Sequence, residues 1–377
     1  MPRRSPPSMT RPTEPVHRSP FLDIDPVRAS RRLELAARRR RRRLIRRGLL
    51  SVLLGVVAAL AVAKGVTTDW GGGSSPSHPA SSGAGGRAPA APRPAPHQPG
   101  VPATPTAAYP AALPGGGQPP LVLRLDDPND PVHVRFHVPP RGGLMFNLDT
   151  GRVLWRRNPV LPVPIASLTK MMTALLVVRS SPANAPVRIT TQAAHYQGSG
   201  VGVLPRNRDV RLETLLYGLM LPSGNDAAIA LAQHVARSTG AFIARMNQGA
   251  AAMGLRCTRF FSVEGLSDKG RSCAADLAVL ARADLDQPRL AHIARTRKVV
   301  KPLAIKGGKV YMFNNNPLLI RGYPGVTGLK TGYTNAAGHC LVATATRHGV
   351  RLGVVLLHSP DTGRQAQQLL NRGFRVP

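Results

Sequence analysis

The sequence predicts an α/β protein, in which one globular domain of strands and helices follows a basic segment, a membrane-spanning helix and a linker. Three observations carry this prediction. Residues of about 140–374 mix strand-like alternation with amphipathic helical stretches. An apolar run with a single charge precedes them, and Gly and Pro, 37 of each in the chain, are densest between the two. The expected divisions are 1–47, 48–66, 67–120 and 121–377.

The first segment, 1–47, holds 15 Arg against four acidic residues, a composition typical of disorder. From Gly48 to Val66 the only charge is Lys64, whose ammonium can extend to the interface. Nineteen residues at about 1.5 Å each span roughly 28 Å, close to the thickness of the bilayer hydrocarbon. Because the basic flank is N-terminal, we expect a single-pass membrane protein with a cytoplasmic N-terminus and an extracytoplasmic domain.

A cleaved signal peptide is the alternative for 48–66, since Ala61-Val62-Ala63 resembles a cleavage site, and the protein would then be secreted. Signal peptides usually total about 15–30 residues, so the long basic segment favours an uncleaved anchor. Residues 71–120 are mostly Gly, Pro, Ala and Ser, which predicts a tether between membrane and domain.

The domain is expected to begin with a β-hairpin of unassigned role. Leu121–Leu125 and Val132–Val138 both alternate apolar and polar residues, and they flank the turn-rich sequence Asp-Asp-Pro-Asn-Asp-Pro. Further along, apolar periodicity predicts helices over 215–221, 226–237 and 361–372, and a strand over 339–346.

Basic residues exceed acidic ones by 33 over the whole chain. The densest part of this excess precedes the apolar run, so we expect no nucleic-acid partner. Residues 48–377 still carry an excess of 22. A solvated basic face explains this excess, and adhesion to an anionic wall polymer is the alternative.

Cysteine and histidine spacing gives no metal site. There is no CxxC or HExxH sequence, and His133 with His137 share a strand face without further ligands. We therefore expect no metal and no cofactor. Cys257 and Cys273 flank a 15-residue loop and either pair or stay reduced, whereas Cys340 lies in an apolar strand and is expected to be a buried thiol.

The first sequence with chemical character is Ser167-Leu168-Thr169-Lys170, at the start of an apolar helix. Residues three apart lie on one helix face, and the helix N-terminus favours negative charge on the Ser167 oxygen. A Lys in such apolar surroundings has a lowered pKa and can act as a general base. A capping Ser beside an incidental Lys is the simpler alternative.

The second is Ser223-Gly224-Asn225, at a predicted bend between two helices. The bend presents a hydroxyl and a carboxamide. An ordinary helix N-cap remains equally compatible with the sequence.

The third is Lys330-Thr331-Gly332, at the edge of a strand-like stretch. A cation, a hydroxyl and a residue without a side chain suit an extended peptide that ends in a carboxylate. A phosphate-binding loop is excluded, because that pattern requires Gly directly before Lys and this chain has Leu329.

The three sequences together, in this order, are expected by chance on the order of 0.01 times in such a chain. The combination is the signature of penicillin-binding proteins and serine β-lactamases. From about Gly143 to Leu357 the chain closely resembles the low-molecular-weight D-alanyl-D-alanine carboxypeptidases of the S11 peptidase family. The resemblance runs through 149–151, 165–173, 215–219, 223–228, 246–247 and 325–334.

This resemblance implies the serine β-lactamase/DD-peptidase-like fold, an antiparallel sheet flanked by helices beside an all-helical lobe. It also implies roles: Ser167 as nucleophile, Lys170 as its base, and Ser223 with Asn225 as proton relay and substrate holder. Substrate binding would fall to Lys330, Thr331, Gly332 and Tyr333, with the backbone amides of Ser167 and Tyr333 as the oxyanion hole.

The implied activity is a serine D-Ala-D-Ala carboxypeptidase that trims peptidoglycan stem pentapeptides and is acylated by β-lactams. A serine β-lactamase is an alternative, but that activity usually needs a Glu that activates water, and no acidic loop of that kind is evident between the second and third sequences. A catalytically idle wall-binding protein is the other. Ser262-Val263-Glu264-Gly265-Leu266 departs from the family's Asn-Pro-x-Gly-Leu, but this loop lies outside the three sequences, so the departure does not argue against catalysis.

Overall fold

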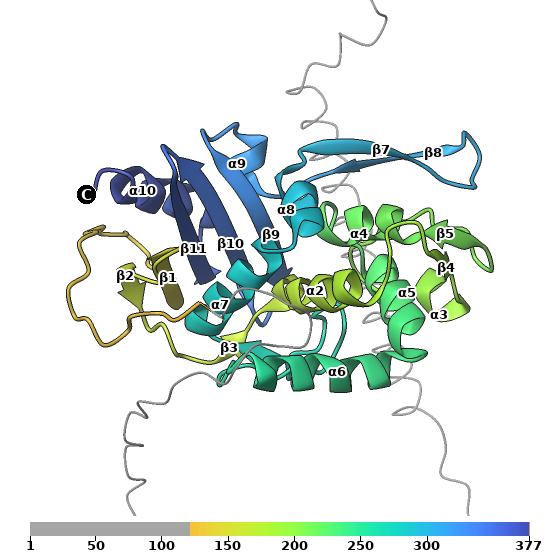
Figure 1. Cartoon of the computed structure of the whole chain (residues 1–377), viewed down its shortest axis with the longest axis horizontal. Helices are drawn as coiled ribbons and strands as arrows, with labels where there is room; N and C mark the ends of the chain where they lie inside the picture. Colours follow the sequence, from red (N-terminus) through yellow and green to blue (C-terminus); the bar gives the residue numbers. More distant parts are fainter. Residues whose placement is uncertain (1–120, 377) are drawn as a thin grey trace, which may run out of the picture. The chain divides into compact units, whose positions relative to one another are not determined.

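The computed structural model describes residues 121–376, and its centre is a five-stranded antiparallel sheet with the strand order β2-β1-β11-β10-β9 (Figure 1). The predicted segments 1–47, 48–66 and 67–120 lie outside the described residues. Within 121–376, no helix has the length and apolar character that a membrane span requires. The sheet strands are β1 (Gly142–Asn147), β2 (Val153–Arg157), β9 (Val326–Thr334), β10 (Gly338–Arg347) and β11 (Val350–Ser359).

Helices cover both faces of the sheet, which explains why the central residues of β10 and β11 are buried and mostly apolar. Val342 and Val355 belong to the core that the sheet shares with the helical lobe. Leu341 and Val354 point to the other face and pack in a second core with Leu369 of the C-terminal helix. The strand and the C-terminal helix predicted from the sequence are therefore confirmed.

The chain between β2 and β9 forms a helical lobe beside the sheet (Figure 1). Its central helix is α2, in which Met171, Met172 and Leu175 are fully buried. Five other helices, α4, α5, α6, α7 and α8, pack around α2. The helices are η1 (Ala166–Thr169), α2 (Lys170–Ser180), α3 (Thr191–Ala194), α4 (Leu212–Met220), α5 (Asn225–Ala236), α6 (Thr239–Ala252), α7 (Ala274–Leu285), α8 (Pro288–Arg295), α9 (Pro317–Ile320) and α10 (Thr362–Gly373).

The β-hairpin predicted at the start of the domain does not form, so that prediction is wrong. Residues 121–138 instead run as an irregular segment against β1 and β2. The Val132 amide donates to the Leu154 carbonyl (2.9 Å), and the Arg156 guanidinium binds the Asp130 carboxylate (2.7 Å). The Arg124 amide likewise donates to the Gly151 carbonyl (3.1 Å), so the strand-like alternation reflects packing against β2 and the turn before it rather than pairing of the two segments with each other.

Three short two-stranded sheets complete the fold. The longest is a hairpin of β7 (Lys298–Pro302) and β8 (Lys309–Phe313), which extends over the upper side of the molecule in Figure 1. The others pair β3 (Val163–Pro164) with β6 (Arg271–Ser272), and β4 (Pro186–Arg188) with β5 (Asp209–Arg211).

Candidate active site

The Ser167 hydroxyl and the Lys170 amine lie one turn apart where η1 passes into α2. The distance from Lys170 Nζ to Ser167 Oγ is 2.8 Å. The same nitrogen is 2.6 Å from Asn225 Oδ1 and 2.8 Å from the Glu264 carbonyl oxygen. The three contacts fix the amine against the serine, so the geometry agrees with the i, i+3 spacing of the sequence.

Lys170 is fully buried, although its side chain carries an amine. Burial, and next the nearby charge of Lys330, hold the pKa of Lys170 well below its usual value of 10.5, while Glu264 and Asp226 oppose the shift. The neutral amine is therefore favoured. A neutral amine has two N–H groups, which match the oxygens of Asn225 and Glu264, and its lone pair is left for the Ser167 hydroxyl proton.

Ser223 occupies the bend between α4 and α5. Its φ of +65° lies in the left-handed region, and Ala166, beside the nucleophile, has a φ of +49°. Backbone conformations of this kind are unfavourable for residues with a side chain, persist only where the surrounding structure holds them in place, and are common at active sites. The bend directs Ser223 Oγ to Lys330 Nζ (2.9 Å). Two residues later Asn225 begins α5, and its side-chain Nδ2 donates to the Gln197 carbonyl.

Lys330 lies on β9, the edge strand of the sheet, as the sequence predicts. Its Nζ donates to Ser223 Oγ (2.9 Å) and to the Thr331 carbonyl (2.9 Å). The side chain is 1% exposed, and burial lowers the pKa of Lys330 to about 7. At neutral pH this amine is therefore poised between its charged and neutral forms, and an arriving carboxylate would favour the charged one.

Gly332 lets the edge strand pass close to the nucleophile. A Cβ at this position would lie 3.0 Å from the Ser167 nitrogen and 3.0 Å from the Ile165 carbonyl oxygen. Any larger residue would push β9 away from η1. Tyr333, next along the strand, is 57% exposed at the surface of the site.

These elements enclose a cleft of about 370 Å³ between the sheet and the lobe. The described residues also line a larger hollow of about 580 Å³ beside β2, but no Ser, Thr, Cys or Lys side chain lines it. Lys170, Asn225 and Lys330 lie behind the wall of the smaller cleft, so the structure brings all eight predicted residues together. That wall is formed by Ser167, Ser199, Ser223, Asn315, Pro317, Thr331, Gly332, Tyr333, His339, Cys340 and Thr362.

The loop of Ser262–Leu266, which lies outside the three sequences, is nevertheless part of the site. Its Glu264 carbonyl holds Lys170, and its Val263 carbonyl accepts from Thr173 Oγ1 (2.7 Å). Gly265 has a φ of +93°, and a Cβ there would lie 2.0 Å from the Ala166 carbonyl oxygen. Glu264 is also an acidic residue between Ser223-Gly224-Asn225 and Lys330-Thr331-Gly332, and its negative charge acts to raise the pKa of Lys170.

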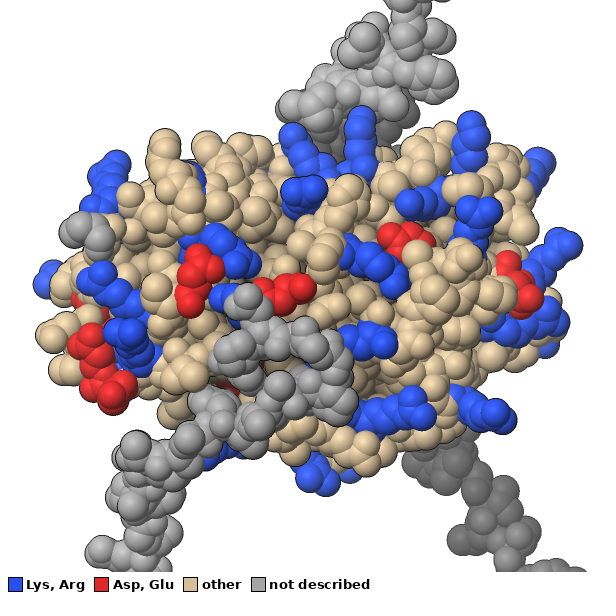
Figure 2. All heavy atoms as spheres, in the orientation of Figure 1, with Lys and Arg blue, Asp and Glu red and all other residues tan. Residues whose placement is uncertain are grey.

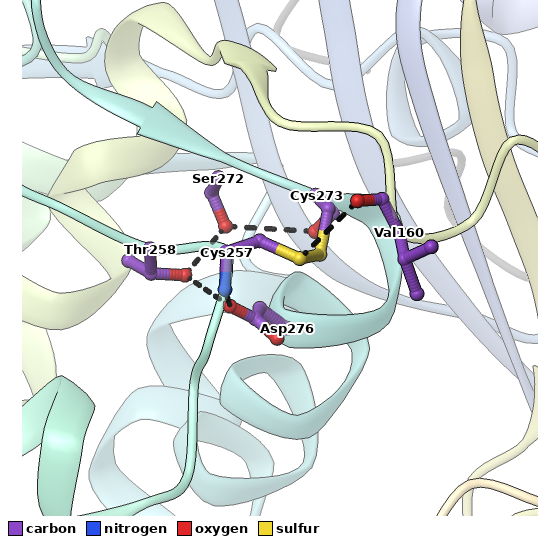
Figure 3. Close-up of a disulfide and its surroundings, with 6 residues drawn as sticks. All are labelled: Val160, Cys257, Thr258, Ser272, Cys273 and Asp276. Atoms are coloured by element: carbon purple, nitrogen blue, oxygen red, sulfur yellow. Dashed lines mark hydrogen bonds between the residues drawn. A yellow bond between two sulfur atoms is a disulfide. The ribbon is translucent and has the colours of Figure 1, made fainter. Parts of the chain in front are cut away.

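A disulfide between Cys257 and Cys273 closes the base of this loop (Figure 3), which settles the alternative that the sequence left open. Beside it, Asp276 accepts from the Cys257 amide (2.7 Å) and from Thr258 Oγ1 (2.7 Å). Cys340 is a buried free thiol, as predicted, and burial raises its pKa to about 11.

Asp226 is a structural residue of the site that sequence reasoning missed. One carboxylate oxygen accepts from the Val201 amide (3.0 Å) and the other from the Gly202 amide (2.9 Å). The carboxylate thereby ties the loop before α4 to the start of α5, and the Ser199 carbonyl of that loop accepts from the Asn225 amide (2.8 Å).

Comparisons with known proteins agree with this arrangement. Residues 139–361 match the family model of peptidase S11, described as D-alanyl-D-alanine carboxypeptidase. The chain is 32% identical to the D-alanyl-D-alanine carboxypeptidase DacF of Bacillus subtilis over 234 residues, which is 60% of this chain and 59% of DacF. It is 34% identical to DacB2 of Mycobacterium tuberculosis over 247 residues, 63% of this chain and 83% of that protein.

Among solved structures, the Streptomyces K15 DD-transpeptidase superposes with a TM-score of 0.61 at 30% identity. The superposition covers 65% of this chain and all of that one. The described domain therefore has the DD-peptidase fold.

Proposed function

The chain belongs to the peptidase S11 family of D-alanyl-D-alanine carboxypeptidases, and from this membership and the geometry of the cleft we propose that it removes the terminal D-Ala from peptidoglycan stem pentapeptides. The observation that carries the proposal is the buried amine of Lys170 at 2.8 Å from the Ser167 hydroxyl. That pair can generate a nucleophile at neutral pH without a metal or a histidine.

In the first step, Ser167 Oγ attacks the carbonyl carbon of the penultimate D-Ala while its proton passes to the neutral amine of Lys170. The backbone amides of Ser167 and Tyr333 would bind the oxyanion that forms. When the C–N bond breaks, the proton returns to the leaving nitrogen through the Ser223 hydroxyl, which contacts Lys330 (2.9 Å). Water then hydrolyses the ester and releases the shortened peptide.

Substrate binding is assigned to β9 and the residues facing it. The exposed edge of β9 offers backbone hydrogen bonds to an extended peptide, and Lys330 with Thr331 would hold its terminal carboxylate. Gly332 permits close approach, Tyr333 covers the outer side, and Asn225 would hold the substrate amide. β-Lactams would enter the same cleft and acylate Ser167.

A serine β-lactamase is the second candidate, because the charge of Glu264 reaches Lys170 from the loop that holds it. A carboxylate at this place could activate water and shorten the life of a penicilloyl ester. The lifetime of that ester separates the two functions: hours for a penicillin-binding protein, less than seconds for a β-lactamase. A protein that acquires no ester would be the idle wall-binding alternative.

The decisive experiment follows the mass of the purified protein after addition of benzylpenicillin, together with D-Ala release from a pentapeptide. We expect a stable penicilloyl adduct on Ser167 and catalytic release of D-Ala. Ser167→Ala should abolish both, whereas Ser199→Ala, which removes another hydroxyl from the same cleft, should retain both. D-Ala release at the wild-type rate by Ser167→Ala would refute the assignment.

We also propose that 48–66 is an uncleaved anchor, with 1–47 in the cytoplasm and the catalytic domain outside. The length of the apolar run and its basic N-terminal flank support this topology. Protease added to intact cells should remove the domain and spare the first 47 residues. Release of a mature form that starts at Lys64 would support the secreted alternative instead. Contact of the basic domain with anionic wall polymer is a further part of this proposal.

A further inference from the structure

The hairpin of β7 and β8 exposes one of its faces, which we call the outer hairpin face. The register pairs Lys298 with Phe313, Val300 with Tyr311 and Pro302 with Lys309, so the face is apolar in the middle and cationic at both ends. Val300, Tyr311 and Phe313 are 50%, 64% and 61% exposed. Grouped large side chains at such exposure commonly mark an interaction surface.

The opposite face of the hairpin is packed against the domain. Val310 and Met312 are buried, and the Lys301 ammonium lies 4.2 Å from the centre of the Tyr217 ring of α4. This anchoring makes the hairpin a fixed part of the domain. The outer hairpin face is therefore not a surface that could turn inward to reach the core.

The charge around this face is of one sign. The 74 residues from 287 to 360 contain eleven Lys or Arg and no Asp or Glu. Figure 2 shows basic side chains along the upper edge of the molecule, where Figure 1 places the hairpin. Beside the hairpin, Ile320 is 61% exposed next to a hollow of about 420 Å³ that Arg297 and Phe313 also line. An anionic partner is thus favoured.

We propose that the outer hairpin face docks on a bilayer that contains anionic phospholipid. Aromatic and aliphatic side chains between Lys residues suit the boundary between headgroups and acyl chains, where each basic residue gains from anionic lipid. An anionic wall polymer would engage the cations but leave Val300, Tyr311 and Phe313 in water. The mixed composition therefore favours lipid over polymer.

Docking rests on the proposed membrane anchor only because the anchor brings the domain near the bilayer. A 54-residue tether at 67–120 with the predicted Gly/Pro-rich behaviour has an expected end-to-end distance of about 40 Å, comparable to the size of the domain. Asn315, two residues beyond Phe313, lines the catalytic cleft. Docking would therefore hold the cleft at a fixed height above the membrane.

The test uses the full chain reconstituted into vesicles of phosphatidylcholine alone or with phosphatidylglycerol. Ala304, exposed at the tip of the hairpin, is replaced by Cys and labelled with an environment-sensitive dye. The native thiols do not interfere, because two form the disulfide and Cys340 is buried. The matched control carries the label at Ala244→Cys, exposed on α6, which lies on the opposite side of the domain in Figure 1.

We expect a blue shift and quenching by brominated lipid at the hairpin label in anionic vesicles only, and neither at the α6 label. Val300→Ser with Tyr311→Ser and Phe313→Ser should abolish the shift. Lys298→Gln and Lys309→Gln should each weaken docking about fivefold, as expected for one cation at an anionic surface. Unchanged penicillin labelling of each variant would verify its fold.

Three outcomes would overturn the proposal: an equal response at both labels, a response independent of phosphatidylglycerol, or a response to soluble polyphosphate but not to vesicles. The last would assign the face to an anionic polymer. Flotation of the protein with vesicles after an alkaline wash reports the proposed anchor separately, so failure of the anchor and failure of docking are distinguishable.

Discussion

Replacing Lys330 by Met should make the protein more stable at neutral pH while it weakens catalysis. The side chain is buried, and its pKa is lowered from 10.5 to about 7. The unfolded chain therefore binds more protons than the folded one between these two pH values, and the stability contributed by this group rises with pH across that window. Met fills a similar volume without a charge to bury.

The size of the effect follows from the pKa. A lowering from 10.5 to about 7 costs the folded state about 4 kcal/mol at pH 7 and about 1–2 kcal/mol at pH 9.5. The variant loses the hydrogen bonds of Lys330 to Ser223 Oγ and the Thr331 carbonyl, worth about 1–2 kcal/mol together. We therefore expect Lys330→Met to gain about 2–3 kcal/mol at pH 7 and to gain almost nothing at pH 9.5.

Urea unfolding at the two pH values, followed by circular dichroism, measures this difference. Lys309→Met, at an exposed position of β8, is the control and should leave stability unchanged at both. Penicillin labelling by Lys330→Met should be slower, and its dependence on pH should move upward, because the charge that lowers the pKa of Lys170 is gone. Equal destabilisation of Lys330→Met at pH 7 and pH 9.5 would contradict the lowered pKa of Lys330.

Three other substitutions test the surroundings of the site. Gly265→Ala should lower the thermal midpoint and slow penicillin labelling, because the new Cβ would meet the Ala166 carbonyl oxygen at 2.0 Å; an unchanged midpoint would contradict the loop conformation. Cys257→Ser with Cys273→Ser should lower the free energy of unfolding in urea by about 3 kcal/mol, the value typical of a disulfide that closes a loop of this length. Reductant should destabilise the wild type but not the variant. Asp226→Asn should lower the free energy of unfolding by about 1–3 kcal/mol, because a carboxylate that accepts from two loop amides is replaced by a group with one acceptor oxygen. The second-order rate of penicillin labelling should also fall. Equal rates in the variant and the wild type would place the loop outside the site.

Much of the catalytic site could be predicted because its chemistry depends on side-chain type. Ser167 and Lys170 are three residues apart, so helix geometry alone brings their polar atoms together. The contact between Lys330 and Ser223 spans 107 residues, and no local rule predicts it; the resemblance to a known family placed both residues in one site without pairing them. The structure adds the direction of the contacts and the burial of both amines.

The parts that escaped prediction depend on the backbone. Every residue has a carbonyl group, so the contact of Glu264 with Lys170 leaves no mark on the sequence beyond the glycine that follows it. The alternation in 121–138 is the same whether a segment pairs with its neighbour or lies against β2, and only the structure distinguishes the two. Cysteine spacing likewise permitted the disulfide without requiring it.

The strand order has a consequence for how the domain is made. β1 and β2 precede the helical lobe, yet β11, the other neighbour of β1 in the sheet, is almost the last element of the chain, about 200 residues later. Because such distant contacts must form before the sheet is complete, the domain should fold slowly and only after its whole length has been synthesised. The same topology thus delays completion of the sheet, and with it formation of the cleft, until the last strand has been made.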